Sequence, residues 1–133
     1  MARFLLDTTV LIDLSQGREP ATTWLRRHAR LGDELGVSPV NITELYSGLA
    51  PEEHSLWDQF MSALTLWPID FNAARRAGLN RYLFARRGIP VSTTNVLVAA
   101  VAEAQQAIIV TANVKDFPQE GITVIRPGDS LEI

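Results

Sequence analysis

The chain has 133 residues and a formal net charge of −3, and 47% of its residues are apolar while 20% are charged. This length and composition predict one domain spanning residues 1–133 and argue against global disorder. The chain has no cysteine, no apolar run near the roughly 18 residues of a membrane span, and too short an N-terminal apolar run for a signal peptide. These features exclude a disulfide framework and a thiolate metal site, and they predict a cytoplasmic protein without a membrane partner.

In the first half of the chain, short apolar runs alternate with helical patterns. Gly17 and Gly32 follow two of these patterns, as glycine commonly does at the C-terminus of a helix. The expected elements are, in order, a strand at 3–6, helices at 8–17 and 19–32, a strand at 34–40, and helices at 41–49 and 51–64.

The second half continues the alternation. Asp70 is a natural cap for a long helix, and Gly88 is its expected stop. The expected elements are a weak strand at 65–69, helices at 70–88 and 92–106, a strand at 107–110, a loop or single turn at 111–121, and a strand at 122–127. Strands that alternate with helices imply βαβ crossovers, so we predict an α/β fold with a central parallel sheet covered on both faces.

Acidic residues follow three of the expected strands. Asp7 comes directly after the strand at 3–6, Glu44 lies in "NITE" after the second strand, and Asp116 lies in "TANVKD" after the strand at 107–110. In an open parallel sheet, ligands bind beyond the carboxyl ends of the strands. We therefore expect these three side chains to gather at one edge of the sheet.

Local explanations exist for each polar residue taken alone. Asp7 is a suitable N-cap, and Asn41 followed by Glu44 has the pattern of a capping box. In "STTNVLVAA", either Ser92 caps the helix with Asn95 in its first turn, or Asn95 is itself the cap. These explanations do not account for three acids converging from three strands.

Three carboxylates brought together repel one another, which raises their pKa values or requires a cation. Oxygen ligands of this kind suit Mg²⁺ or Mn²⁺ rather than zinc. Such ions can activate water and stabilise charge during phosphodiester hydrolysis. The hydroxyls of Thr9 and Thr111 and the amide of Asn113 are candidates either to bind substrate phosphate or to hold the carboxylates.

Other chemistries have little support in the sequence. His28 and His54 lie in helical segments that we expect to be exposed, and Asp13 is expected to face solvent. The chain has no G-x-S-x-G elbow and no glycine-rich nucleotide-binding loop. A phosphatase of the haloacid dehalogenase type would need a second aspartate two residues after Asp7, where this chain has Thr9.

The positive charge is almost entirely arginine. Residues 11 apart on a helix nearly eclipse, so Arg76 is expected to align with Arg87, with Asn80 between them. Two interpretations stay open for this face: a solvated helix surface, or a strip that contacts phosphates and leads into the acidic site.

The motifs "FLLDTTVLIDL", "NITELYSG", "TTNVLVAAVAEA" and "VTANVKDF" resemble those of PIN-domain ribonucleases, and most closely VapC-type toxins of bacterial toxin–antitoxin pairs. The resemblance implies a three-layer α/β/α sandwich. It implies Mg²⁺- or Mn²⁺-dependent endoribonuclease action on structured RNA such as tRNA or rRNA. It also implies a homodimer that is silenced by a cognate antitoxin protein and contacts operator DNA only through the antitoxin complex.

By this resemblance, Asp7, Glu44 and Asp116 take the places of the first, second and fourth acids of the family. Thr9 and Asn113 match supporting polar positions. Asn95 stands where the family has its third acid. The implied metal ligands are Asp7, Asn95 and Asp116, with Glu44 completing the acidic cluster.

The amide of Asn95 removes one negative charge from a site whose metal affinity depends on charge. Two explanations stay open: a natural member with weakened or lost catalysis, or an acid-to-amide substitution introduced to disarm a toxic nuclease. The alternative function is a catalytically inactive PIN-like module that binds an antitoxin without cleaving RNA.

Overall fold

The computed structural model describes residues 1–129. Its centre is a five-stranded sheet in the order β3-β2-β1-β4-β5, in which every neighbouring pair is parallel. The strands are β1 (Arg3–Leu6), β2 (Glu34–Val37), β3 (Thr65–Leu66), β4 (Ile108–Val110) and β5 (Val124–Ile125). The predicted α/β fold with a central parallel sheet is confirmed.

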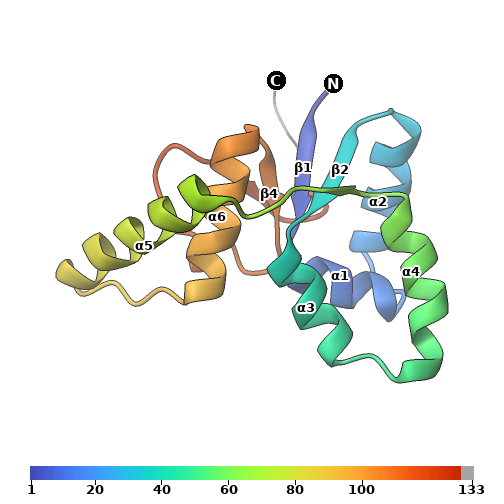
Figure 1. The fold of residues 1–133 in the computed structure, drawn as a ribbon. Helices are drawn as coiled ribbons and strands as arrows, with labels where there is room; N and C mark the ends of the chain where they lie inside the picture. Colours follow the sequence, from blue (N-terminus) through green and yellow to red (C-terminus); the bar gives the residue numbers. More distant parts are fainter. Residues whose placement is uncertain (130–133) are drawn as a thin grey trace.

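Six α-helices and two short 3-10 turns connect the strands (Figure 1). They are α1 (Thr8–Ser15), α2 (Ala21–Arg30), α3 (Pro39–Ser47), α4 (His54–Ser62), α5 (Phe71–Arg86) and α6 (Thr93–Gln105), with η1 (Pro51–Glu53) and η2 (Val114–Asp116). None of the helices in the described part of the chain is long and apolar enough to cross a lipid bilayer.

The two faces of the sheet are covered by different helices, because successive side chains of a strand point to opposite faces. Phe4 and Leu6 of β1 pack with the first four helices, through Leu11, Trp24, Leu45 and Trp57. Leu5 of β1 and Ile109 of β4 point the other way and pack against α6. The result is the three-layer α/β/α arrangement that the resemblance implied.

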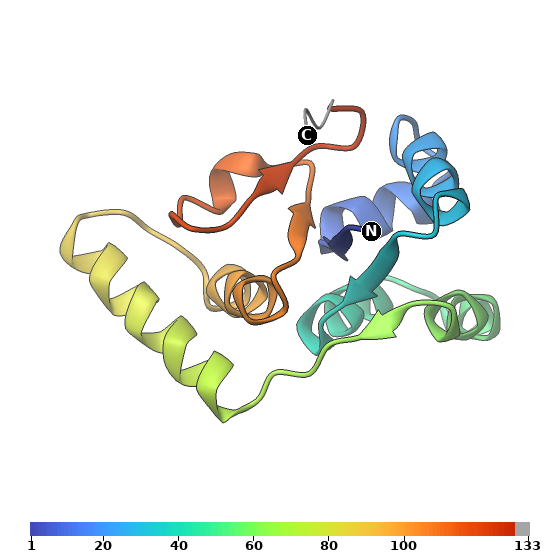
Figure 2. The ribbon, with the colours of Figure 1, turned by 90° about the horizontal axis from the view of Figure 1, so that it is seen from above.

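Helix α5 lies outside α6 rather than on the sheet (Figure 2). Ala73 and Ala77 of α5 pack against Val96 and Ala100 of α6. Small side chains at this contact let the two helices approach closely. Asp70 caps α5 as predicted, because its carboxylate accepts a hydrogen bond from the backbone N–H of Ala73 at 2.8 Å.

The predicted boundary between the second strand and third helix is wrong. Strand β2 ends at Val37, and α3 begins at Pro39 with Ser38 as its N-cap. Proline suits the first helical position because its missing N–H would have no partner there. Asn41 is therefore the third residue of the helix and not its cap, so the predicted capping box from Asn41 to Glu44 does not exist.

Three predictions of exposed side chains are also wrong. His28 is only 15% exposed, because its ring packs against Phe4 and Trp24 and contacts Asp33 at 2.8 Å. His54 is half-buried beside the ring of Tyr46. Asp13 is likewise half-buried, with its carboxylate 3.5 Å from the guanidinium of Arg18.

Candidate active site

The candidate site lies at the carboxyl edge of the sheet, where β1 is flanked by β2 and β4. Each of these strands is followed at once by a polar residue: Asp7 after β1, Ser38 after β2 and Thr111 after β4. Helices α1 and α3 begin at this edge (Figure 1). The topology therefore brings together side chains that are more than 100 positions apart in the chain, such as Asp7 and Thr111.

Asp7 is the centre of a buried network of hydrogen bonds. One carboxylate oxygen, Oδ2, accepts from the hydroxyl of Thr111 at 2.8 Å and from that of Thr9 at 3.3 Å. The other, Oδ1, accepts from the amide Nδ2 of Asn41 at 3.2 Å. Asp7 occupies the N-cap position of α1, but its carboxylate makes no capping hydrogen bond. The predicted N-cap position of Asp7 is therefore confirmed. Its carboxylate is used in the hydrogen-bond network at the edge of the sheet and not in capping the helix.

The electrostatics of this carboxylate are unfavourable without a cation. Asp7 is 6% exposed, and burial raises its pKa above the ordinary value. Hydrogen bonds from Thr111, the Thr8 backbone and Thr9 lower the pKa and offset part of the rise, while the charge of Glu44 adds to it. A positive ion beside Asp7 would favour the charged form.

Asn41 is a site residue that the sequence reasoning missed. It is fully buried, and its Nδ2 donates both to Asp7 and to the hydroxyl of Thr8 at 3.1 Å. Its Oδ1 accepts from the hydroxyl of Ser38 at 2.6 Å. A Ser-Pro pair at the start of a helix, with an amide two residues after the proline, is the signal that could have identified it.

Glu44 reaches the same network from α3. Its Oε1 accepts from the hydroxyl of Thr8 at 2.7 Å, and Thr8 accepts in turn from Asn41. Glu44 is exposed, whereas Thr8 and Asn41 are buried. Thr8 and Asn41 thus join the two carboxylates of Asp7 and Glu44 through one chain of hydrogen bonds.

The threonines hold the site together. The hydroxyl of Thr9 accepts from the backbone N–H of Ala112 at 3.0 Å and lies 3.2 Å from the hydroxyl of Thr111. The Thr111 hydroxyl accepts from the backbone N–H of Asn113 at 3.1 Å. Of the two roles considered for these hydroxyls, the structure supports holding the carboxylate and the loop after β4. The side chain of Asn113 is exposed.

Asn95 and Asp116 form a second pair. Asn95 is the third residue of α6, and its backbone N–H donates to the hydroxyl of Ser92 at 3.0 Å. Ser92 is therefore the cap, and Asn95 lies in the first turn. Asp116 ends η2 and is exposed. The two residues line one small hollow together with Val96 and Phe117.

The four predicted site residues therefore fall into two pairs, Asp7 with Glu44 and Asn95 with Asp116. Within residues 1–129, no three His, Cys, Asp or Glu side chains come close enough to form a metal-binding group. By chemical type, the oxygen donors of this edge fit a hard divalent cation. By charge, the set holds three carboxylates and one neutral amide.

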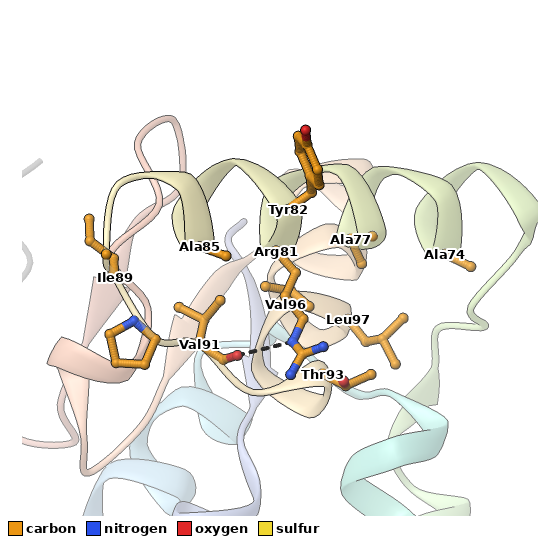
Figure 3. Close-up of a pocket in the computed structure, with 13 residues that line it drawn as sticks. Ala74, Ala77, Arg81, Tyr82, Ala85, Ile89, Val91, Thr93, Val96 and Leu97 are labelled. Atoms are coloured by element: carbon orange, nitrogen blue, oxygen red, sulfur yellow. Dashed lines mark hydrogen bonds between the residues drawn. The ribbon is translucent and has the colours of Figure 1, made fainter.

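A much larger hollow of about 890 Å³ lies elsewhere, between α5, the segment 88–93 and the start of α6 (Figure 3). Aliphatic side chains, proline included, make up most of its wall, and Arg81 donates there to the backbone carbonyl of Val91 at 3.2 Å. No carboxylate from the described part of the chain lines it. Its size does not make it the site of chemistry, because none of the described residues that line it is an acid or a histidine that could hold a cation.

The sequence matches the model of the PIN domain family over residues 4–119. It is 31% identical over 116 residues to ribonuclease VapC19 of Mycobacterium tuberculosis, covering 86% of this chain and 91% of that protein. It is 30% identical over 126 residues to the tRNA(fMet)-specific endonuclease VapC of Shigella flexneri, covering 91% and 94% of the two chains.

Solved structures agree with this relationship. A DNA-bound VapBC from Salmonella typhimurium superimposes with a TM-score of 0.79 at 27% identity, over 95% of this chain and 98% of that one. VapBC2 from Rickettsia felis, bound to a fragment of promoter DNA, superimposes with a TM-score of 0.80 at 21% identity, over 93% of this chain and 98% of that one. At this identity, the likeness is one of fold. The chain therefore belongs to the PIN-domain family, where its relatives include the VapC ribonucleases.

Proposed function

We propose that this protein is the toxin of a type II toxin–antitoxin system and hydrolyses structured RNA, such as tRNA or rRNA. The observation that carries the proposal is the buried carboxylate of Asp7, held by Asn41 and Thr111 at the carboxyl edge of the sheet and joined to Glu44. Burying an acid at a site that needs compensating charge is costly for folding, and such arrangements concentrate at functional sites. The ribonuclease relatives support the same activity.

The site residues have distinct proposed roles. Asp7, Asn95 and Asp116 would hold Mg²⁺ or Mn²⁺, and Glu44 would complete the acidic cluster. When bound, the cation would supply Lewis-acid stabilisation of phosphate charge and promote the activation of water. Asn41, Thr9 and Thr111 keep the Asp7 carboxylate fixed in one orientation, so that no rearrangement is needed when the substrate binds.

The proposed partners follow from the relatives in VapBC complexes. We expect a cognate antitoxin to bind and silence this chain, and contact with operator DNA to occur only through the antitoxin complex. We also expect a homodimer. Cellular RNA is the proposed substrate, so the protein is expected to act in the cytoplasm.

A second candidate function is favoured by Asn95. An amide offers one neutral oxygen where the family pattern has an acid, so the metal site of this chain is one negative charge short. A chain in this state would keep the antitoxin-binding surface and lose RNA cleavage. This candidate predicts co-purification with an antitoxin and no cleavage from any variant at position 95.

The experiment compares the given chain with its Asn95→Asp variant on total cellular RNA, in Mg²⁺, in Mn²⁺ and in EDTA. We expect the added carboxylate to increase the cleavage rate at limiting metal by about tenfold or more. Mutation of the groups that only hydrogen-bond to metal ligands already lowers metal affinity or activity by about 10–100-fold. The matched control carries Asn95→Asp together with Asp7→Asn and should be inactive. If the Asn95→Asp variant folds and binds metal but cuts no RNA, the nuclease proposal fails and the binding module replaces it.

A further inference from the structure

A polar hollow of about 260 Å³ lies between α5, α6 and the segment that follows η2. Arg76 and Asn80 of α5 line it, together with Arg87, the C-cap residue of that helix. The predicted alignment of these three residues along one face of the helix is therefore confirmed, and this face is turned toward a cavity. Glu103, Gln119 and Glu120 form the opposite part of its wall.

The charges at one end of this hollow are already paired. The carboxylate of Glu103 forms an ion pair with Nε of Arg76 at 3.0 Å and accepts a hydrogen bond from Nε2 of Gln119 at 3.3 Å. Contact with a carboxylate sets the orientation of the Gln119 amide, because its NH₂ group and not its oxygen must face Glu103. Arg76 is therefore neutralised locally, and Gln119 is held in place by a neighbour.

This orientation leaves the oxygen of Gln119 without a donor. The Oε1 atom is buried, and no described residue hydrogen-bonds to it. Buried polar atoms in folded proteins almost always have a partner, so each exception needs an explanation. Gln119 as a residue is only partly buried, so a shift of its side chain on ligand binding would bring this oxygen to a donor in the hollow.

Arg87, at the other end, makes no ion pair within residues 1–129. Its guanidinium lies 5.8 Å from the centre of the Phe84 ring. A guanidinium is always charged and presents a planar fork of donors that matches phosphate. The hollow thus offers a cation at one end and an unpartnered acceptor at the other.

The hollow adjoins the candidate active site. Phe84, Pro118 and Gln119 line both this hollow and the small one that holds Asn95 and Asp116. The two hollows therefore share part of their walls, and this hollow is a neighbour of the one that holds Asn95 and Asp116.

We propose that this hollow is a subsite for one nucleotide of single-stranded RNA next to the cleaved phosphodiester. Arg87 binds its phosphate, and Oε1 of Gln119 accepts a hydrogen bond from its ribose 2′-hydroxyl or from a donor on its base. The negative charges of Glu103 and Glu120 repel phosphate from the Gln119 end of the hollow, so the phosphate binds at Arg87. This inference rests on the proposed ribonuclease function and adds a positioning site for the substrate.

The test measures RNA binding without cleavage, using the given chain in EDTA and a fluorescein-labelled single-stranded oligoribonucleotide followed by anisotropy. We expect Arg87→Gln to weaken binding by about tenfold or more, the loss expected for a hydrogen bond to a charged group. It should also reduce the slope of log K against log salt by about 0.7, the value for one phosphate contact on a single strand. The matched control is Arg86→Gln, since Arg86 lies 4.3 Å over the Tyr82 ring and does not line the hollow. That control should change binding less than about twofold.

A second variant, Gln119→Leu, tests the other end with RNA and with DNA of the same sequence. An affinity loss in RNA alone identifies the 2′-hydroxyl as the donor, and an equal loss in both identifies the base.

Equal behaviour of Arg87→Gln and Arg86→Gln, with both folded by circular dichroism, would overturn the subsite while leaving the proposed function intact. Loss of antitoxin co-purification by Arg87→Gln with unchanged RNA binding would overturn it in favour of a protein-docking surface. Failure of the given chain itself to bind RNA would overturn the proposed function and this inference with it.

Discussion

Asn41→Asp is the substitution that tests the buried network most directly. The two side chains have nearly the same shape, so the change leaves packing intact and replaces a donor by a second carboxylate. In the structure, Nδ2 of Asn41 lies 3.2 Å from Oδ1 of Asp7, and both residues are buried. The variant therefore places two acids in direct contact.

The cost has an upper bound that depends on pH. At 3.2 Å, two full charges would repel by about 5 kcal/mol at an effective dielectric constant near 20. The pair can avoid this by sharing one proton, as carboxylate dyads do. Protonating a carboxylate costs about 1.36 kcal/mol for each pH unit above the ordinary aspartate pKa of about 3.9. The shared proton therefore costs about 4 kcal/mol at pH 7 but only about 1.5 kcal/mol at pH 5. We therefore expect a loss of about 4 kcal/mol in the free energy of unfolding at pH 7, falling to about 1.5 kcal/mol at pH 5.

Urea denaturation at pH 7 and pH 5, in EDTA, measures this difference. The matched control is Asn41→Ser, which loses the same hydrogen bonds without adding a charge and should cost about the same at both values of pH. An equal loss of stability for Asn41→Asp at pH 5 and pH 7 would refute the contact between Asn41 and Asp7 on which the reasoning rests.

Two further predictions concern Asp7 and Gly36. Burial raises the pKa of Asp7 in the folded protein above its value in the unfolded chain. The stabilisation that protonated Asp7 contributes is therefore complete below the unfolded pKa, and it is lost as the pH rises through the folded pKa. Asp7→Asn should therefore raise the melting temperature at pH 7 in EDTA, with a smaller gain toward pH 4, and thermal scans that show no gain at pH 7 would contradict this. A Cβ added at Gly36 would overlap the buried ring of Trp67, so Gly36→Ala should destabilise the fold by about 1–3 kcal/mol in urea, whereas Gly78→Ala, with open space on α5, should be neutral or stabilising.

Much of the fold could be predicted from local signals. Apolar runs gave the positions of the strands, and Asp70, Gly17 and Gly88 marked the ends of helices α1 and α5 closely. The boundary before α3 was missed because Val40 continues the apolar pattern of the strand. Only the Ser-Pro pair signals that the helix has already begun.

The candidate site was predictable in part. The rule that ligands bind at the carboxyl ends of parallel strands led to Asp7, Glu44 and Asp116. It could not identify Thr8 or Asn41, because neither carries a charge and each fits an ordinary helix start. Their role depends on the distance between α1 and α3. The side chain of His28 was likewise expected to be exposed, since a helix pattern does not show which aromatic rings will pack beside it.

By itself, the sequence determined the order of the elements, the parallel sheet and the family to which the chain belongs, because these depend on periodicity, helix punctuation and motifs within short segments. The tertiary structure decided which polar groups meet. It divided the four site residues into two pairs, buried the Asp7 carboxylate among Asn41, Thr9 and Thr111, and turned the arginine face of α5 toward a hollow beside Asn95. The physical reason is that burial and hydrogen bonding act between side chains distant in the chain, whereas propensities and caps act within a few residues.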